Sequence, residues 1–153
     1  MEAACAVSFP LLAAWMVEPD GGREIAGVVL AVTASCCLLA VGALYWHAAL
    51  CRVRGNPEPM RHALRIARRL KRPLLALAIA SLVWAVFLCF LDPSSAALAA
   101  LGFSALAVLE YVNYYHVQLQ NFDHLPDFKR LLRRRRLRQA HLAADLKKVA
   151  GER

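Results

Sequence analysis

Residues 109–124 carry the side chains best suited to chemistry, in the stretch LEYVNYYHVQLQNFDH. The stretch begins at the end of a long apolar run, and a helix continued through it places its polar side chains on one arc of about 120°. A carboxylate, amides, a phenol and an imidazole would then form one stripe, made of Glu110, Asn113, Tyr114, Gln120, Asn121 and His124. His116 lies beside this stripe.

Glu110 stands out because it lies within an apolar segment. Counted from Ala96 at about 1.5 Å per residue, it lies about 21 Å along a helix, short of the far side of a hydrocarbon layer about 30 Å thick. A carboxylate at that depth normally faces the interior of a helix bundle or a wet cavity and has a partner. The partners we consider are His47, at the end of an earlier apolar segment, and the Lys71–Arg72 pair.

Four kinds of chemistry fit the stripe. The first is a hydrogen-bonded junction between helices, which needs no ligand. The second is a site for a lipid headgroup or small polar ligand, because polar groups would converge beside an apolar wall. The third is a proton or ion path with Glu110 and His116 as titrating groups. A metal site at His116, Asp123 and His124 is the least favoured, because this spacing is not diagnostic of ligation.

Catalysis is not favoured by the sequence, although it is not excluded. The chain has no glycine-rich phosphate loop, no H-E-x-x-H or G-x-S-x-G motif, and no dense acidic motif that would hold Mg²⁺. The five cysteines have neither C-x-x-C nor zinc-like spacing, so we interpret them as small packing residues. No catalytic residue, metal ligand or cofactor is therefore predicted.

We expect membrane-spanning helices to carry these residues. The chain has 153 residues, of which 59% are hydrophobic, and a formal net charge of +8 that is confined to a few segments. Such segregation is typical of a polytopic membrane protein, because an unpaired charge in hydrocarbon is costly. Three apolar runs are long enough to span a bilayer, namely Ile25–Leu50, Pro73–Leu91 and Ala96 to about Tyr115.

The first apolar segment is ambiguous. Ala3–Val17 has 15 residues and contains Pro10, which is short for a membrane span. It either crosses as a fourth, shorter helix or dips into the outer leaflet. We favour four helices, because an even-numbered bundle buries every apolar segment. The predicted fold is therefore all-α, a polytopic transmembrane helical bundle of three or four spans.

The basic residues predict the orientation. Of the 19 lysines and arginines, all but Arg23 lie either between residues 48 and 72 or after Asn121. The positive-inside rule places both segments in the cytoplasm. We therefore expect a multi-pass protein of the cell inner (cytoplasmic) membrane, with the Asp92 turn outside and the C-terminus cytoplasmic.

Residues 60–72, MRHALRIARRLKR, predict an amphipathic helix that lies in the membrane interface. Its apolar side would face the acyl chains. Its basic side would contact anionic lipid headgroups and consists of Arg61, Arg65, Arg68, Arg69 and Arg72.

The C-terminal segment predicts a basic cytoplasmic helical tail. Asp127–Val149 has an apolar stripe that Arg135 interrupts, which indicates two shorter helices or one imperfectly docked helix. Nucleic acid is a disfavoured partner because no aromatic residues alternate with the RRRR run. We divide the chain into a transmembrane bundle, residues 1–124, which includes the interfacial helix, and the tail, residues 125–153.

The predicted function is noncatalytic. We expect a lipid-associated scaffold or accessory subunit that recruits a protein partner at the cytoplasmic surface through the basic tail. Small residues in the spans permit close helix packing and homo-oligomers. A small oligomeric channel or transporter that uses Glu110 is one alternative, and a membrane enzyme that acts on a lipid headgroup is the other.

Overall fold

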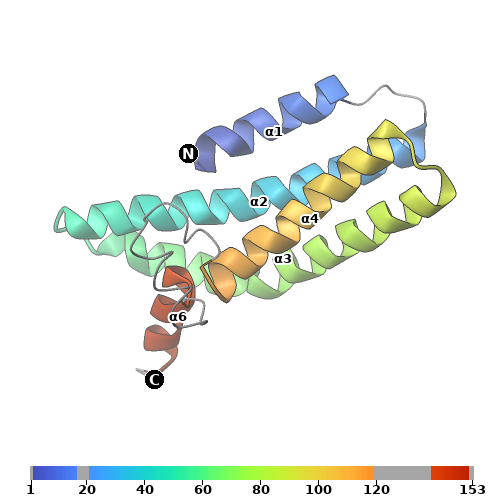
Figure 1. Cartoon of the computed structure of the whole chain (residues 1–153). Coiled ribbons are helices and arrows are strands. Elements are labelled where there is room, and N and C mark those ends of the chain that lie inside the picture. Colours follow the sequence, from blue (N-terminus) through green and yellow to red (C-terminus); the bar gives the residue numbers. More distant parts are fainter. Residues whose placement is uncertain (1, 17–20, 119–138, 152–153) are drawn as a thin grey trace, which may run out of the picture.

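The computed structural model of this chain describes residues 2–16, 21–118 and 139–151. These residues form helices α1 (Glu2–Met16), α2 (Gly22–Val53), α3 (Glu58–Leu91), α4 (Ser95–Tyr115) and α6 (His141–Gly151). Figure 1 shows α2, α3 and α4 packed along one another, with α1 on the outside of the bundle and α6 near one end. In the described ranges the only β pairing is one isolated bridge, so the all-α prediction is confirmed.

Helices α2, α3 and α4 are long and apolar enough to cross a membrane. α4 has 21 residues, which corresponds to about 31 Å and thus to the thickness of a hydrocarbon layer. The second half of α3 exposes large apolar side chains along its length, including Leu75, Ile79, Val83 and Phe87. A continuous apolar surface of this kind is unfavourable in contact with water. The three long apolar helices therefore support the prediction of a multi-pass membrane protein.

Small side chains hold the three long helices together. The most deeply buried positions of the core include Ala31, Ser35, Ala78, Ala100 and Ser104, each at most 1% exposed. The Ser35 hydroxyl also donates a hydrogen bond of 2.8 Å to the Phe103 carbonyl oxygen, which links α2 to α4. Without a hydrophobic driving force in lipid, helices associate by this kind of close packing between small residues.

The turn between α3 and α4 is joined to the start of α2. Ser94 caps α4, because its hydroxyl oxygen accepts a hydrogen bond from the Ala97 backbone N–H. The same hydroxyl donates to a carboxylate oxygen of Glu24 at 2.8 Å. α2 and α4 therefore start at the same level and run in the same direction. α3 runs in the opposite direction and ends at the turn before α4 (Figure 1).

Gly42 on α2 makes room for a large side chain of α4. It is buried beside Tyr114, and a Cβ atom added at Gly42 would overlap the Tyr114 hydroxyl and ring. A tyrosine ring is rigid, so it can avoid such an atom only by moving as a whole. Gly42 thus provides the space that the Tyr114 side chain occupies.

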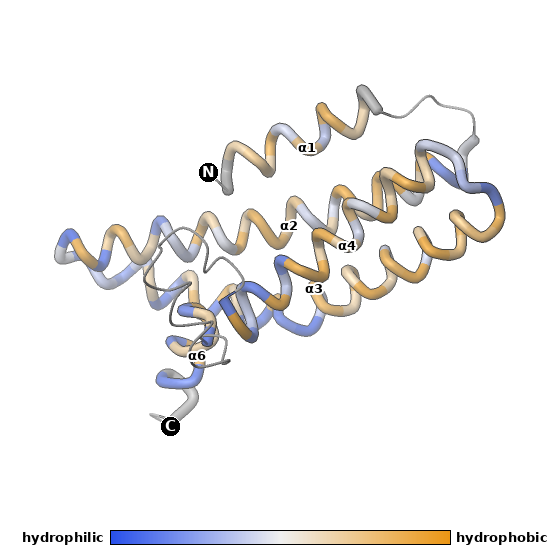
Figure 2. Tube along the Cα trace, viewed as in Figure 1, coloured by the Kyte–Doolittle hydropathy of each residue, from blue (hydrophilic) through white to orange (hydrophobic). Residues whose placement is uncertain are grey.

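Residues 60–72 differ from the prediction. They are the first half of the continuous helix α3, which passes through Pro73, and do not form a separate helix in the membrane interface. Their apolar side, with Met60, Ala63, Leu64 and Ala67, is buried in the protein core with residues of α2, α4 and α6. Lipid is not needed to cover this side, because other helices already do so. Figure 2 shows α3 changing direction near a hydrophilic stretch in its middle.

Helix α1 is shorter than the three helices that are long enough to cross a membrane. Its 15 residues correspond to about 22 Å. It packs against α2 and α4, with Ala13 buried and the rings of Phe9 and Phe103 at a centroid distance of 5.5 Å. The expectation that this segment crosses the membrane as a fourth helix stays a prediction.

Replacing Gly42 by alanine should destabilise the bundle. The added methyl group overlaps Tyr114, and overpacking of this kind costs about 1–3 kcal/mol. Thermal unfolding in mild detergent should show a lower transition temperature. Gly102→Ala is the matched control, because nothing lies within 4 Å of a Cβ atom at that position of α4. Equal transition temperatures for the two variants would contradict the proposed close approach.

Candidate functional site

The polar stripe predicted over residues 109–124 ends earlier than expected. α4 stops at Tyr115, and His116 has non-helical backbone angles, φ −131° and ψ −74°. Val117 then forms the isolated bridge with Gln139. The continuous helix to His124 is thus wrong, because the chain turns at His116 to meet the segment before α6. Gln120, Asn121, Asp123 and His124 lie outside the described residues.

The remaining residues of the predicted site lie at different places. Glu110 and Asn113 are half-buried on α4, and Tyr114 is fully buried against α2. His116 is exposed at the end of α4, with its ring 5.7 Å from that of Tyr111. His47 is exposed on α2, where its ring nitrogens lie 4.0 Å from Cys51 Sγ.

Asn113 and Tyr114 meet α6 at a small cavity. This cavity of about 30 Å³ is also lined by Tyr45 and Trp46 of α2 and by His141 and Leu142 of α6. Its size suits at most one water molecule. The structure therefore brings Asn113 and Tyr114 to a place where three helices meet. All four interpretations of the polar stripe stay predictions.

Tyr115 fixes the end of α4 to α3. Its hydroxyl donates a hydrogen bond of 2.9 Å to the Ala67 carbonyl oxygen, and its side chain is buried. The Lys71 ammonium lies 6.0 Å from the centroid of the same ring. The end of α4 is thereby held at the level of residues 67–71, where the basic half of α3 ends.

Helix α6 docks on the bundle through both apolar and polar contacts. Leu142 is 2% exposed and belongs to the same core cluster as the buried residues of α2 and α3. The Tyr45 hydroxyl donates a hydrogen bond of 3.0 Å to Asp145 Oδ2, and Arg52 lies 3.5 Å from the same oxygen. Lys148 adds a longer ion pair to the other Asp145 oxygen, at 3.8 Å. The sequence predicts an apolar stripe on this segment but not the surface of the bundle that it meets.

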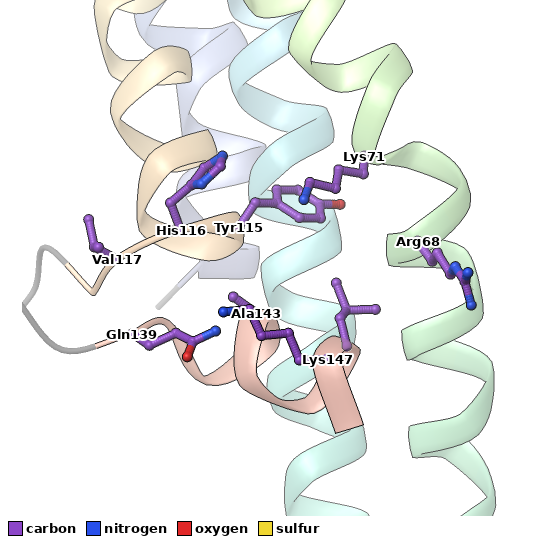
Figure 3. Close-up of a pocket in the computed structure, with 9 residues that line it drawn as sticks. Arg68, Lys71, Tyr115, His116, Val117, Gln139, Ala143 and Lys147 are labelled. Atoms are coloured by element: carbon purple, nitrogen blue, oxygen red, sulfur yellow. The ribbon is translucent and has the colours of Figure 1, made fainter. Parts of the chain in front are cut away.

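A cavity of about 590 Å³ opens between α3, the end of α4 and α6. Figure 3 shows Lys71 extending beside the Tyr115 ring, Arg68 one turn earlier on α3, and Lys147 on α6. The other lining residues are His116, Val117, Gln139, Ala143 and Leu146. Among all the residues that line the cavity, Arg68 and His116 are predicted site residues. The sequence suggests Lys71 only as a partner of Glu110.

The predicted arginine side of residues 60–72 is exposed. Arg61, Arg65, Arg68, Arg69 and Arg72 all face away from the buried side of α3. Arg61 pairs with Glu58 at 3.2 Å, and both side chains are largely exposed. Contact of these arginines with anionic lipid stays a prediction.

No protein-family model matches this chain, and no curated protein or solved structure is similar enough to count as a match. Functional inference therefore depends on the geometry described above.

Asp145→Ala should loosen the docking of α6. The change leaves the partly buried Tyr45 hydroxyl without its acceptor and removes the pairing with Arg52. Hydrogen bonds to charged groups contribute about 1.5–3 kcal/mol, so amide hydrogen exchange in residues 141–151 should become roughly tenfold faster or more.

Lys148→Ala is the control for this measurement. It removes only the 3.8 Å ion pair to Asp145. The Lys148 side chain is itself 75% exposed, and a long pair with so exposed a group contributes little. If exchange in residues 141–151 is as slow in Asp145→Ala as in the wild type, the Tyr45–Asp145 contact does not hold α6 in place.

Proposed function

We propose that this chain is a noncatalytic, lipid-associated membrane protein that acts as a scaffold or accessory subunit at the inner surface of the cell inner membrane. One observation carries the proposal. The arginines of residues 60–72 are displayed on one side of a helix that continues directly into a membrane-spanning segment. A basic surface fixed to a membrane helix is held where anionic headgroups are concentrated.

The length of α4 supports this placement. If α4 spans the hydrocarbon layer, its last residue, Tyr115, marks the boundary with the headgroups, and the hydrogen bond to Ala67 places that part of α3 at the same level. Arg68, Arg69 and Arg72 are therefore close to the lipid surface.

Arg61 has a different environment. It lies about 9 Å along the helix axis from Ala67, on the side away from the membrane-spanning half of α3. Electrostatic attraction is screened within about 8 Å at physiological ionic strength, so the membrane surface attracts Arg61 weakly. We assign Arg61 to the surface that meets an acidic protein partner.

The orientation is part of the proposal. The positive-inside rule assigns the basic end of the bundle, with the α2–α3 turn and α6, to the cytoplasm. Both basic segments that the structure describes lie toward this end, away from the turn that contains Asp92, which supports a single consistent orientation (Figure 2).

The proposal predicts selective retention of anionic lipid. Native mass spectrometry of the protein, extracted in mild detergent from bilayers of phosphatidylcholine and phosphatidylglycerol, should show phosphatidylglycerol enriched on the wild type. A double variant, Arg69→Gln with Arg72→Gln, should retain roughly thirtyfold less, because each cation near the surface contributes about 1 kcal/mol. The control is Arg61→Gln, which should retain anionic lipid as the wild type does.

Three results would contradict the proposal. Equal retention of both lipids by the wild type would remove the lipid association. A closed oligomer without selective lipid would instead favour the channel or transporter that uses Glu110, and the spectrum reports subunit number directly. Turnover of a lipid headgroup during the incubation would favour the enzyme.

A further inference from the structure

The cavity between α3, α4 and α6 has an unusual charge balance. Its lining includes three cationic side chains, Arg68, Lys71 and Lys147, and no carboxylate among the nine lining residues drawn in Figure 3. Within the part of the chain that the structure describes, none of the three forms an ion pair. By contrast, the nearby Arg52 and Lys148 both pair with Asp145.

Cations that line one space repel one another, and an anion bound between them offsets this repulsion. We propose that this cavity, referred to here as the cationic cavity, binds a phosphate monoester group. The inference rests on the proposed lipid association and specifies its ligand chemistry. A phosphate monoester carries a charge of about −1.5 to −2 at pH 7, whereas a phosphate diester carries only one. The monoester therefore balances the three cations better.

The donors suit phosphate oxygens. Lysine ammonium groups provide point charges with three N–H donors each, and an arginine can bind two phosphate oxygens at once. Lys71 and Lys147 approach from different helices, and the flexible side chain of Arg68 lies one turn before Lys71 on α3 (Figure 3). The Tyr115 hydroxyl already donates to Ala67, so the tyrosine forms a wall and not a ligand.

The rest of the cavity suits the part of a lipid next to its phosphate. Val117, Ala143 and Leu146 give it an apolar side, and it opens at the end of α4, where the headgroup layer is expected. A volume of about 590 Å³ is within the range of cavities that hold small organic ligands. The same chemistry could come from a phosphatidate lipid or from a soluble phosphate monoester, and the test separates these sources.

The test measures binding of short-chain phosphatidate and short-chain phosphatidylglycerol to the purified full-length protein, at one ionic strength. Wild type should bind phosphatidate roughly tenfold more tightly. In Lys147→Gln this preference should fall severalfold, since one of three cations is lost. Lys148→Gln is the matched control, because the adjacent lysine on α6 does not line the cavity. Both side chains are exposed, so neither substitution should impair folding.

Inorganic phosphate and glycerol phosphate serve as competitors. If they displace phosphatidate only at far higher concentration, the source is the lipid headgroup. If they compete equally well, the phosphate chemistry holds and the source is soluble.

Equal affinity for phosphatidate and phosphatidylglycerol, or equal losses in Lys147→Gln and Lys148→Gln, would overturn the inference. Those results leave the proposed lipid association intact if both anionic lipids still bind more tightly than phosphatidylcholine. If they do not, the proposed function fails as well.

Discussion

α4 is much shorter than its two neighbours, and this difference in length determines where the other parts of the structure can lie. α4 has 21 residues, whereas α2 has 32 and α3 has 34. Since all three begin or end near the Ser94–Glu24 contact, the surplus of α2 and α3 extends beyond Tyr115 at the other end. α6 docks in the space left beyond the end of α4, and the cationic cavity forms there.

Much of the fold could be predicted from the sequence, because lipid imposes simple rules. Uncharged apolar runs of sufficient length can only be helices, and each of the three runs lies within one of the long helices. The end of the third run near Tyr115 also agrees with the end of α4. The one-sided pattern of residues 60–72 correctly indicated that its arginines are exposed.

What covers an apolar side could not be predicted, because a protein interior and a lipid layer are equally apolar. The pattern around Met60 and Leu64 was therefore assigned to lipid, although α2, α4 and α6 cover it. The cationic cavity was missed for a related reason. Its lysines are separated by 76 positions along the chain, from Lys71 to Lys147, and only the docking of α6 brings them to one site. Leu142 and Leu146 on one side of the tail were the only sequence signal for that docking.

The hydrogen bond between Ser94 and Glu24 also limits how the chain can change in length during evolution. It sets the level at which α2 and α4 start, and each inserted or deleted residue rotates the rest of a helix by about 100°. One such change within α4 before Tyr114 would turn that ring away from Gly42 and Tyr115 away from Ala67. The α2–α3 turn, where Gly55 adopts a φ of +89°, is exposed. Its residues therefore do not have to stay aligned with a neighbouring helix. Insertions in homologous chains are thus expected at that turn, and α4 should keep its length.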